Sequence, residues 1–392
     1  MVDFHKSWSG QLHAVATLMD EMQALGHHVV LACRSDSLFV EMGRQRGWNV
    51  WPALYLIGGF RPRKRLADLF RLCRYIVRND FDLIHVNGSQ DHWLAAFAIR
   101  LTRRKMALVR TRHNTKKVAN TWSNRLLNQR WTDLQITACE LLIKDYQNHP
   151  AFLKKTLVSI HQGVYLDRTR TDAAHRSRLR ASLGFSESDC VLGISARVHP
   201  DKGHRYLLDA MAALNRPDLK LLVIGDGPGL QIMQAYAADI GVASRVHFAG
   251  YVDDVGTLLQ IVDIGIQPSV GIETSCLAIK EIMALQKPVI VSDYGGLPEI
   301  VNHEVEGLVV SHGSAQALAR AIGRLADDRH AAAMMGRAGR RRVEDQFTAR
   351  LCAIRTLNAY RLALTQIRPP NNRLPGGPGE LLAASRLPTT AE

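Results

Sequence analysis

The sequence predicts an α/β protein of two domains, each built on a parallel sheet that helices cover on both faces. Short runs rich in Val, Ile and Leu alternate with helical patterns along the chain, and such strands are typical of parallel sheets buried on both faces. The length of 392 residues, with 46% hydrophobic and 22% charged residues, suits two globular domains rather than one.

The predicted strands form two groups that meet near residues 160–166. The first group is 27–33, 81–87, 106–112 and 133–139, and the second is 191–195, 219–225, 245–250, 263–269 and 287–293. We therefore place the domains at 1–163 and 164–345. Ligands bind beyond the carboxyl ends of parallel strands, so two such domains that face each other would form a cleft.

Both ends of the chain depart from this pattern. The segment "MVDF" is a very short lead into the loop "HKSWSGQ" and the helix that follows, although the first strand of such a sheet is usually central. We expect either a truncated first strand or a true start further upstream. Residues 331–365 are predicted to form a long helical stretch. Residues 368–392 carry five of the 14 prolines and are predicted to be disordered.

Composition indicates the cellular compartment of the protein and the class of its binding partner. We expect no membrane span, since no apolar run is long enough, and no secretory leader. The six cysteines are scattered without a C-x-x-C pair, as in a reduced cytoplasmic protein. Residues 1–165 hold 24 Lys and Arg against 12 Asp and Glu, whereas residues 166–392 hold 26 against 24. This asymmetry indicates an anionic partner for the first half (a nucleic acid, an acidic membrane surface or a phosphorylated glycan), with a solvated surface as the alternative.

Two loops of the second half follow predicted strands. In "SARVHPDKGH", Arg197 and Lys202 suit a phosphate, because Arg offers a planar fork and Lys a point charge. A solvated basic loop is the alternative. The glycines of "VIGDGPG", at 223–229, are spaced G-x-G-x-G rather than G-x-G-x-x-G, which favours a tight turn over a dinucleotide fingerprint.

The stretch "GIETSCLAIKEIMALQKPVI" places Glu273 eight residues before Glu281. A helix is predicted to begin near Thr274 or Ser275, both good caps, and its N-terminus would suit a phosphate. On one helix the two acids would lie about 12 Å apart along the axis and about 80° apart around it. That spacing suits two separate hydroxyl-bearing groups on either side of a phosphate, as in a nucleotide sugar. A charge at a helix start is the alternative for Glu273.

These segments together resemble a known family. The chain contains, in order, "ISARVHPDKG", "IGDGPG", "VHFAGYVDD", "VDIGIQPS", the Glu273 and Glu281 pair, and "KPVIVSDYGGLPEIV". Their order and spacing resemble the retaining glycosyltransferases of the group 1 type, strongly over 185–350 and more loosely over 1–165. The resemblance implies the GT-B fold, in which two Rossmann-like domains face each other across a cleft. It also implies that the last helical segment, 346–367, crosses back to the first domain.

The resemblance implies roles for individual residues. Glu273 would contact hydroxyls of the transferred sugar and Glu281 the ribose, Arg197 and Lys202 would neutralise the diphosphate, and Tyr251 and Val252 would lie near the base. The wider donor-binding set adds the helix-start segment and the loop after the first strand: Thr274, Ser275, Cys276, Leu277, Ser9 and Gly10. Many members read Glu-Pro-Phe-Gly from the first acid onward, whereas this chain reads Glu-Thr-Ser-Cys at 273–276. Because Thr274 to Cys276 depart from the family's motif, the resemblance does not indicate which sugar is transferred.

His113, in "RTRHNT", is the residue we expect to face the donor sugar. His85 and His92 compete for that role, with a structural histidine as their alternative. The segment "SIHQGVYLD" resembles the family's hinge and keeps Gly163 and Val164, while His161, Gln162 and Tyr165 depart from it.

The implied reaction is transfer of a sugar from a nucleoside diphosphate to an acceptor hydroxyl with retention of configuration. Positive groups would stabilise the leaving diphosphate, and no metal or other cofactor is expected; His113, Glu273, Arg197 and Lys202 would be the catalytic set. A D-x-D reading of "DFD" at 80–82 is disfavoured, because it precedes a strand rather than following one.

The acceptor is expected to meet the basic first half. The cations there are Arg61, Arg63, Lys64, Arg65, Arg71, Arg74 and Arg78. They form a basic amphipathic helix that suits an anionic membrane, with an ordinary packed helix as the alternative. We expect an anionic glycan or lipid-linked acceptor of lipopolysaccharide or cell-envelope synthesis, at the inner face of the cytoplasmic membrane. Three alternative functions remain. A nucleic-acid-binding protein is disfavoured, because this chain lacks aromatic residues interleaved with its cations. The others are a non-catalytic relative and a GT-B epimerase or phosphorylase, although a phosphorylase should carry a pyridoxal lysine and none is identified.

Overall fold

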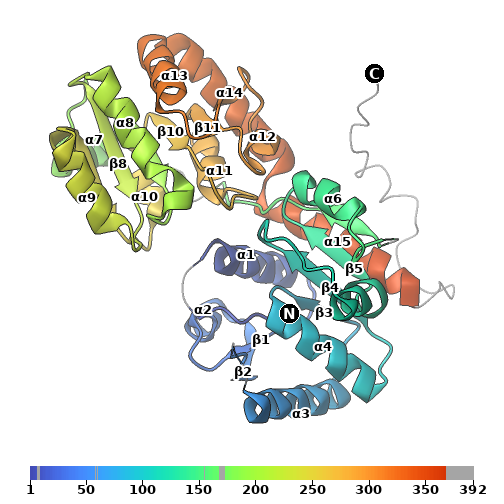
Figure 1. Cartoon of the computed structure of the whole chain (residues 1–392). Coiled ribbons are helices and arrows are strands. Elements are labelled where there is room, and N and C mark those ends of the chain that lie inside the picture. Colours follow the sequence, from blue (N-terminus) through green and yellow to red (C-terminus); the bar gives the residue numbers. More distant parts are fainter. Residues whose placement is uncertain (7–8, 58, 60, 154, 167–172, 368–392) are drawn as a thin grey trace.

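The computed structural model describes residues 1–6, 9–57, 59, 61–153, 155–166 and 173–367. They form two α/β domains with parallel sheets (Figure 1), which confirms the predicted fold class. The tail 368–392, predicted to be disordered, lies outside these residues. In the described part of the chain, no helix is both long and apolar enough to cross a membrane.

The first domain contains a parallel sheet that is interrupted at its centre. Its strands are β1 (Val30–Arg34), β2 (Asn49–Leu54), β3 (Leu83–Val86), β4 (Ala107–Arg112), β5 (Leu134–Thr137) and β6 (Leu157–Ser159). They form a pair, β2-β1, and a four-stranded sheet, β3-β4-β5-β6. Val2 joins the two through single bridges to Ala32 and Val86. The first strand is therefore reduced to one bridging residue at the central position.

Helices cover this sheet on both faces. They are α1 (Gly10–Ala24), α2 (Leu38–Arg46), α3 (Pro62–Arg78), α4 (Ser89–Thr102), the short α5 (Trp122–Arg125) with the π-helical turn Leu126–Trp131, and α6 (Glu140–Gln147). Residues of α3 and α4 pack with Ile84 and Leu108 in one cluster. Residues of α1 and α2 pack with Leu31 and Cys33 in a second cluster.

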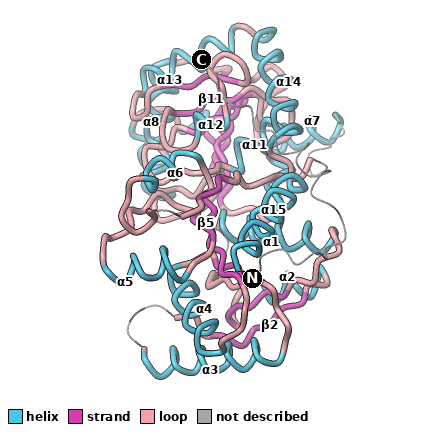
Figure 2. Tube along the Cα trace, turned by 90° about the vertical axis from the view of Figure 1, so that its right-hand side faces the viewer, coloured by secondary structure: helices cyan, strands magenta, loops and turns pink. Residues whose placement is uncertain are grey.

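The second domain has one continuous parallel sheet. Its strands are β7 (Cys190–Ser195), β8 (Leu219–Ile224), β9 (Val246–Gly250), β10 (Ile264–Gln267), β11 (Val289–Ser292) and β12 (Gly307–Val310), in the order β12-β11-β10-β7-β8-β9. Figure 2 shows strands in magenta, β11 among them, with helices in cyan on either side. Successive residues point to opposite faces. Leu221 and Val223 accordingly enter one apolar cluster and Leu222 and Ile224 the other.

Its helices form the two outer layers. They are α7 (Ala173–Ser182), α8 (His204–Leu214), α9 (Leu230–Asp239), α10 (Val255–Leu259), α11 (Leu277–Ala284), α12 (Leu297–Ile300), α13 (Ala315–Asp327) and α14 (Arg329–Gln346), with 3₁₀ turns at Pro200–Lys202 and Ala243–Arg245. Helices α8, α9 and α13 contribute to one cluster, α10, α11 and α12 to the other, and α14 to both. The sheet is thus buried on both faces, as its apolar strands predict.

Two chain segments connect the domains, and they pair with each other. The stretch predicted to be helical at 331–365 is helical in the structure and consists of two helices, α14 and α15 (Ala349–Ile367), that break where the chain meets the hinge. The N–H of Val164 donates to the carbonyl of Phe347, and that of Ala349 to the carbonyl of Val164, both at 2.8 Å. A Cβ at Gly163 would lie 2.4 Å from the Thr348 oxygen, so only glycine fits. Helix α15 then packs on α1, β4 and β5 of the first domain (Figure 1).

Candidate functional site

Three loops of the second domain converge at the carboxyl ends of β7, β10 and β11, which are neighbours in the sheet. A Cβ on Gly203 would lie 2.0 Å from the carbonyl oxygen of Pro268, and one on Gly296 would lie 1.9 Å from that of Thr274. Glycine at these two positions therefore allows the loops after β7 and β11 to contact the loop after β10. This is the edge at which open parallel sheets bind ligands.

An ion pair between Lys202 and Glu273 lies at the centre of these loops. Lys202 Nζ is 2.7 Å from Glu273 Oε2, and it also donates to the carbonyl of Ile272 at 3.2 Å. Ser269 Oγ donates to the same Glu273 oxygen at 3.0 Å. An ammonium has three hydrogens, so one remains for a ligand. Within the described residues no group donates to Glu273 Oε1, which leaves this oxygen as an acceptor.

Arg197 lies in the first of the three loops with its side chain exposed. Within the part of the chain that the structure describes, its guanidinium has no ion-pair partner. The turn after β8 packs under this loop, where a Cβ on Gly225 would lie 2.2 Å from the oxygen of Ala196. Gly225 and Gly227 have φ of +138° and +155°, which side chains disfavour. The glycines of "VIGDGPG" thus serve a tight turn that supports the Arg197 loop.

The start of α11 differs from the prediction. The helix begins at Leu277, and its N-cap residue Cys276 makes no side-chain capping bond. Thr274 and Ser275 are therefore not caps. Glu273 precedes the helix, so the spacing of about 12 Å that assumed one helix for both acids does not apply. Glu281 is half-buried in the second turn of α11.

Thr274 and Ser275 instead contact the first domain and the hinge. Thr274 Oγ1 donates to the carbonyl oxygen of His113 at 3.1 Å. The backbone N–H of Gln162 donates to Ser275 Oγ at 3.0 Å. These bonds bring the end of β4, the hinge and the Glu273 loop together. Thr274 is thus bound by the first domain and Ser275 by the hinge.

His113 lies at the carboxyl end of β4, facing this loop. Its Nε2 is 2.9 Å from Asn87 Oδ1, and its Nδ1 is 3.1 Å from Gln162 Nε2. An amide oxygen accepts and an amide nitrogen donates, so the ring carries its hydrogen on Nε2. Burial lowers the pKa of His113 to about 4, and the ring is neutral at pH 7. With both nitrogens bonded, the ring is fixed in orientation rather than poised to transfer a proton.

Lys280 is a buried cation beside the hinge that the sequence prediction missed. Its side chain is fully buried, and Nζ donates to the carbonyl oxygen of Gln162 at 2.7 Å and to Ser275 Oγ at 2.6 Å. The ammonium also lies 4.8 Å from the ring centroid of Phe347. Burial lowers the pKa of Lys280 to about 7. A lysine next to Glu281 inside the mostly apolar run "LAIKEIMA" was the signal available in the sequence.

A second connection between the domains was also missed. Glu299, in α12, accepts from the N–H groups of Glu140 and Leu141 at 2.7 Å each, and so caps α6 of the first domain. Its carboxylate is also 3.0 Å from His161 Nε2. Burial raises the pKa of Glu299, but these three bonds outweigh it and hold the pKa below its ordinary value. Glu299 therefore joins α12, the hinge and α6 as an acceptor.

Other predicted donor residues lie outside this cluster. Tyr251 follows β9 at the sheet edge, is 50% exposed, and donates to Asp253 at 2.7 Å. The adjacent Val252 packs on an apolar cluster. Ser9 Oγ caps α1 by accepting from Leu12 N–H at 3.1 Å, and Gly10 is exposed. Among the described residues, no hydrogen bond joins Ser9 or Gly10 to the Glu273 loop. Positions 7 and 8 of the predicted loop lie outside the described residues.

The competing histidines are structural. His85 is 2% exposed, with Nδ1 2.6 Å from the hydroxyl of Tyr360 and Nε2 2.6 Å from that of Thr111. His92 is buried against Thr132 at 2.7 Å. Burial lowers the pKa of both histidines well below the ordinary value. The "DFD" segment precedes β3, at the sheet edge opposite to the site, and the described residues contain no group of metal-ligating side chains.

Helix α3 has two apolar faces rather than one. Leu72 and Ile76 are buried in the domain core, whereas Leu66, Phe70 and Val77 are 66%, 66% and 52% exposed. The exposed cations beside them are Arg61, Arg63, Lys64, Arg65, Arg74 and Arg78. Arg71 is instead half-buried; it donates to the carbonyl of Ala53 at 2.8 Å and lies over the Tyr55 ring. The helix is thus both packed on its sheet and amphipathic toward solvent.

Comparison with known proteins identifies the family of both domains. Residues 175–342 match the family described as glycosyl transferases group 1, and residues 8–168 match glycosyltransferase family 4. The second domain thus belongs to the group 1 glycosyltransferases, and the first domain to glycosyltransferase family 4. The match to the first domain includes β1 to β6, so both halves of the GT-B architecture are present.

Curated relatives and solved structures support the assignment. A GDP-mannose-dependent alpha-(1-6)-phosphatidylinositol monomannoside mannosyltransferase of Mycobacterium tuberculosis is 35% identical over 195 residues, covering 47% of this chain and 50% of the relative. The chain thus spans about half the length of that relative. A glycosyltransferase of Rickettsia africae has a TM-score of 0.83 at 18% identity, covering 93% of this chain and 97% of its own. Anabaena Alr3699/HepE, in complex with UDP, has a TM-score of 0.79 at 22% identity, covering 91% and 97%.

Proposed function

We propose that this protein is a retaining glycosyltransferase, which moves a sugar from a nucleoside diphosphate to a hydroxyl of an anionic glycan or lipid-linked acceptor of the cell envelope. The observation that carries the proposal is the Lys202–Glu273 pair, which offers an ammonium hydrogen and a carboxylate oxygen side by side at the ligand-binding edge of the sheet. A nucleotide sugar presents the complementary groups, an anionic diphosphate joined directly to a ring of hydroxyls.

Each end of the donor has a partner in this arrangement. Glu273 Oε1 accepts from sugar hydroxyls, because the side chain is fixed through Oε2 by Lys202 and Ser269. Lys202 and the exposed Arg197 neutralise the diphosphate. Glu281, further along α11, is the proposed acceptor for the ribose hydroxyls. Tyr251 and Val252 lie beyond β9, on the side proposed for the base.

In the proposed reaction, the bond between the anomeric carbon and the diphosphate oxygen breaks while the acceptor oxygen bonds to the same face of that carbon. The acceptor proton passes to the departing phosphate oxygen, so charge and atoms balance without a metal. Charge develops on the diphosphate as the bond breaks, and preorganised cations stabilise this state more than the ground state. Lys202 and Arg197 therefore act on the leaving group. His113 positions the sugar through the face of its neutral ring.

The acceptor side of the proposal rests on α3. Its exposed Leu66 and Phe70 lie four residues apart, on one stripe of the helix, with cations on either side. Such a helix inserts its apolar side chains at the headgroup level while its cations bind anionic lipid. The mannosyltransferase relative acts, by its name, on a phosphatidylinositol mannoside. An acceptor carried in an anionic membrane fits this surface.

A donor screen tests the central proposal. The purified chain is incubated with UDP-, GDP- and ADP-sugars, and melting temperature and nucleoside diphosphate release are measured. At least one donor should raise the melting temperature, and Lys202→Ala should abolish that rise. Lys220→Ala, on β8 of the same domain, is the matched control and should keep it. The proposal is wrong if no donor binds, or if both lysine variants bind the donor as the wild type does.

Co-sedimentation with vesicles tests the acceptor surface. Wild type should sediment with phosphatidylglycerol-containing vesicles and much less with pure phosphatidylcholine. Phe70→Asp should reduce the bound fraction about tenfold, because a charge replaces an inserted ring. Val305→Asp, at a comparably exposed position of the second domain (51%), is the control. Equal binding to both vesicle types would remove the membrane from the proposal and leave a soluble anionic glycan.

A further inference from the structure

Lys280, on α11 of the second domain, lies where both connections between the domains meet the Glu273 loop. Its side chain is fully buried. Nζ donates to the carbonyl oxygen of Gln162 in the hinge at 2.7 Å and to Ser275 Oγ at 2.6 Å. The same ammonium lies 4.8 Å from the ring centroid of Phe347, in the segment that returns to the first domain. One side chain therefore contacts the hinge, the return segment and the Glu273 loop.

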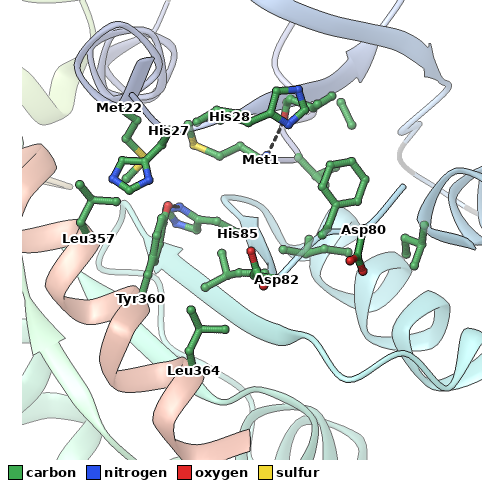
Figure 3. A pocket seen from close by; sticks show the side chains of 18 of the residues that line it. Met1, Met22, His27, His28, Asp80, Asp82, His85, Leu357, Tyr360 and Leu364 are labelled. Carbon is green, nitrogen blue, oxygen red and sulfur yellow. Dashed lines mark hydrogen bonds between the residues drawn. The ribbon is translucent and has the colours of Figure 1, made fainter. Parts of the chain in front are cut away.

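The return segment continues into α15, which is attached to the first domain. The hydroxyl of Tyr360, on α15, is 2.6 Å from Nδ1 of His85 on β3. Figure 3 shows these two side chains next to each other in the wall of a cavity of about 340 Å³. Movements between domains occur in segments at the ends of such elements. Here those segments are the hinge and the break between α14 and α15, and Lys280 contacts both.

The hinge residue Gln162 connects Lys280 to His113. Its backbone carbonyl accepts from Lys280, and its side-chain Nε2 donates to His113 Nδ1 at 3.1 Å. The position of this backbone determines where the amide lies. Lys280 therefore influences the orientation of the ring that faces the proposed donor sugar.

Ser275 connects Lys280 to Glu299. Its Oγ accepts from Lys280 and from the N–H of Gln162, so both of its lone pairs are used. Burial lowers the pKa of His161, and the neutral ring carries its one hydrogen on Nε2, toward the Glu299 carboxylate at 3.0 Å. His161 Nδ1 is then the acceptor for the Ser275 hydroxyl, 3.4 Å away. A directed series of hydrogen bonds thus runs from α11 through the hinge to α12.

The ammonium of Lys280 is unfavourable for stability at this place. Burial disfavours its charge, and among the described residues no carboxylate forms an ion pair with it. Glu273 also acts on it but is paired with Lys202. The other titratable groups that act on it are thiols whose pKa burial raises: Cys139, Cys276 and Cys352. A buried charge without an ionic partner destabilises a fold. What the ammonium adds is its hydrogen bonds to the hinge and to the Glu273 loop.

We propose that Lys280 is a positioning residue of the transferase, which holds the hinge and the Glu273 loop at the spacing where His113 and Glu273 face the same donor sugar. The inference rests on the proposed function, because that function assigns the sugar to these two residues. Lys280 does not contact the donor and acts through Gln162 and Ser275.

Lys280→Met tests the proposal, because methionine keeps most of the length of the side chain and removes the donor. With the nucleotide sugar found by screening, kcat should fall about 10- to 100-fold, since a displacement of about 1 Å is enough for such a loss. KM for the nucleotide sugar should change less than about threefold, because Lys202 and Arg197 still bind the diphosphate. Lys287→Met, which removes a lysine 4.0 Å from Asp263 at the opposite edge of the sheet, is the control and should keep both values. A folded Lys280→Met with the wild-type kcat would overturn the proposal.

A double-mutant cycle separates positioning from a loss of packing. Gln162→Met removes the amide that binds His113 and leaves the backbone carbonyl that binds Lys280. If Lys280 acts through this amide, Lys280→Met should lower kcat at least about threefold less in the Gln162→Met background than in wild type. Equal losses in the two backgrounds would contradict the proposal and leave Lys280 as a structural residue.

Nitrogen NMR of the histidine rings tests the same contact without a donor. The signal of His113 Nδ1, assigned by its absence in His113→Asn, should shift in Lys280→Met and stay in place in Lys287→Met. An unmoved signal would overturn the proposal. If Lys280→Met does not fold, Lys280→Gln replaces it, because its amide can still donate to one of the two acceptors. If wild type binds no nucleotide sugar, the proposed function fails, and the shift still shows whether Lys280 positions His113.

Discussion

Glu273→Gln provides a direct test of the proposed donor site. The substitution keeps the shape of the side chain and removes its charge. The amide retains one oxygen, and that oxygen cannot serve both Lys202, at 2.7 Å, and a sugar hydroxyl as the carboxylate does. Hydrogen bonds to charged groups contribute about 1.5–3 kcal/mol. Loss of one such bond in the transition state predicts that kcat/KM falls about 10- to 150-fold.

The same substitution has a smaller expected effect on stability. The side chain of Lys202 is 23% exposed, so water solvates much of the ammonium that loses its partner. The melting temperature should fall by about 2–4 °C, the shift that accompanies about 1 kcal/mol in a domain of about 150–250 residues. Product formation with the donor found by screening gives kcat/KM, and thermal unfolding gives stability. Glu304→Gln, whose carboxylate forms an exposed pair with Arg324, is the matched control for both.

A double-mutant cycle separates a contact with the sugar from an indirect effect through Lys202. If Glu273 only holds Lys202, then Glu273→Gln should change nothing in a Lys202→Met background. If Glu273 contacts the sugar, the loss should persist there. A variant with the wild-type kcat/KM and a lowered melting temperature would refute the donor role and leave Glu273 as a structural partner of Lys202.

Three further substitutions test the contacts around the site. The pKa of Lys280 is about 7 in the folded protein and 10.5 for the free side chain. Its burial therefore lowers the free energy of unfolding increasingly as the pH falls toward 7. In urea unfolding, the Lys280→Met variant should lose less stability than wild type between about pH 9.5 and about pH 7. Glu299→Gln should lower the free energy of unfolding by about 1–3 kcal/mol at neutral pH, because an amide cannot accept from both N–H groups of α6. The folded pKa of Glu299 is lowered, so the difference in stability from wild type should shrink as the pH falls and the carboxylate is protonated. Tyr360→Phe leaves the buried Nδ1 of His85 without its partner and should cost about 1–3 kcal/mol in thermal unfolding, with donor affinity unchanged.

The strands of the second domain were predictable because burial on both faces leaves a plain apolar signal. The run 219–225 was predicted as a strand, and β8 is Leu219–Ile224. Strand β2 was missed, because "NVWPAL" is largely exposed or half-buried and contains a proline. Strand β12 was missed because "GLVV" is short and its last two residues are only half-buried. Where one face of a strand is exposed to solvent, its sequence no longer forms a continuous apolar run, and the strand is harder to predict.

The sequence predicted which charged residues lie at the candidate site, but not which hydrogen bonds connect the site to the other domain. The positions of Lys202 and Glu273 at strand ends follow from the order of strands and loops. The start of α11 was placed too early, because Thr274 and Ser275 are good caps by local rules but bind His113 and Gln162 of other segments. Glu299 was missed for a related reason, since its partners in α6 are more than 150 residues away. Contacts between domains override local preference, and one sequence does not display them.

The return of α15 to the first domain has a consequence for how the protein is made. Residues Val109, Ile136 and Ile160 share a cluster with Ala359 and Ala363 of α15. During synthesis the amino-terminal part of a chain emerges first and tends to fold first. Here the sheet of that part keeps one apolar face uncovered until Ala359 and Ala363 have left the ribosome. The first domain is therefore completed last, and a premature stop anywhere before α15 would release it with that face open to aggregation.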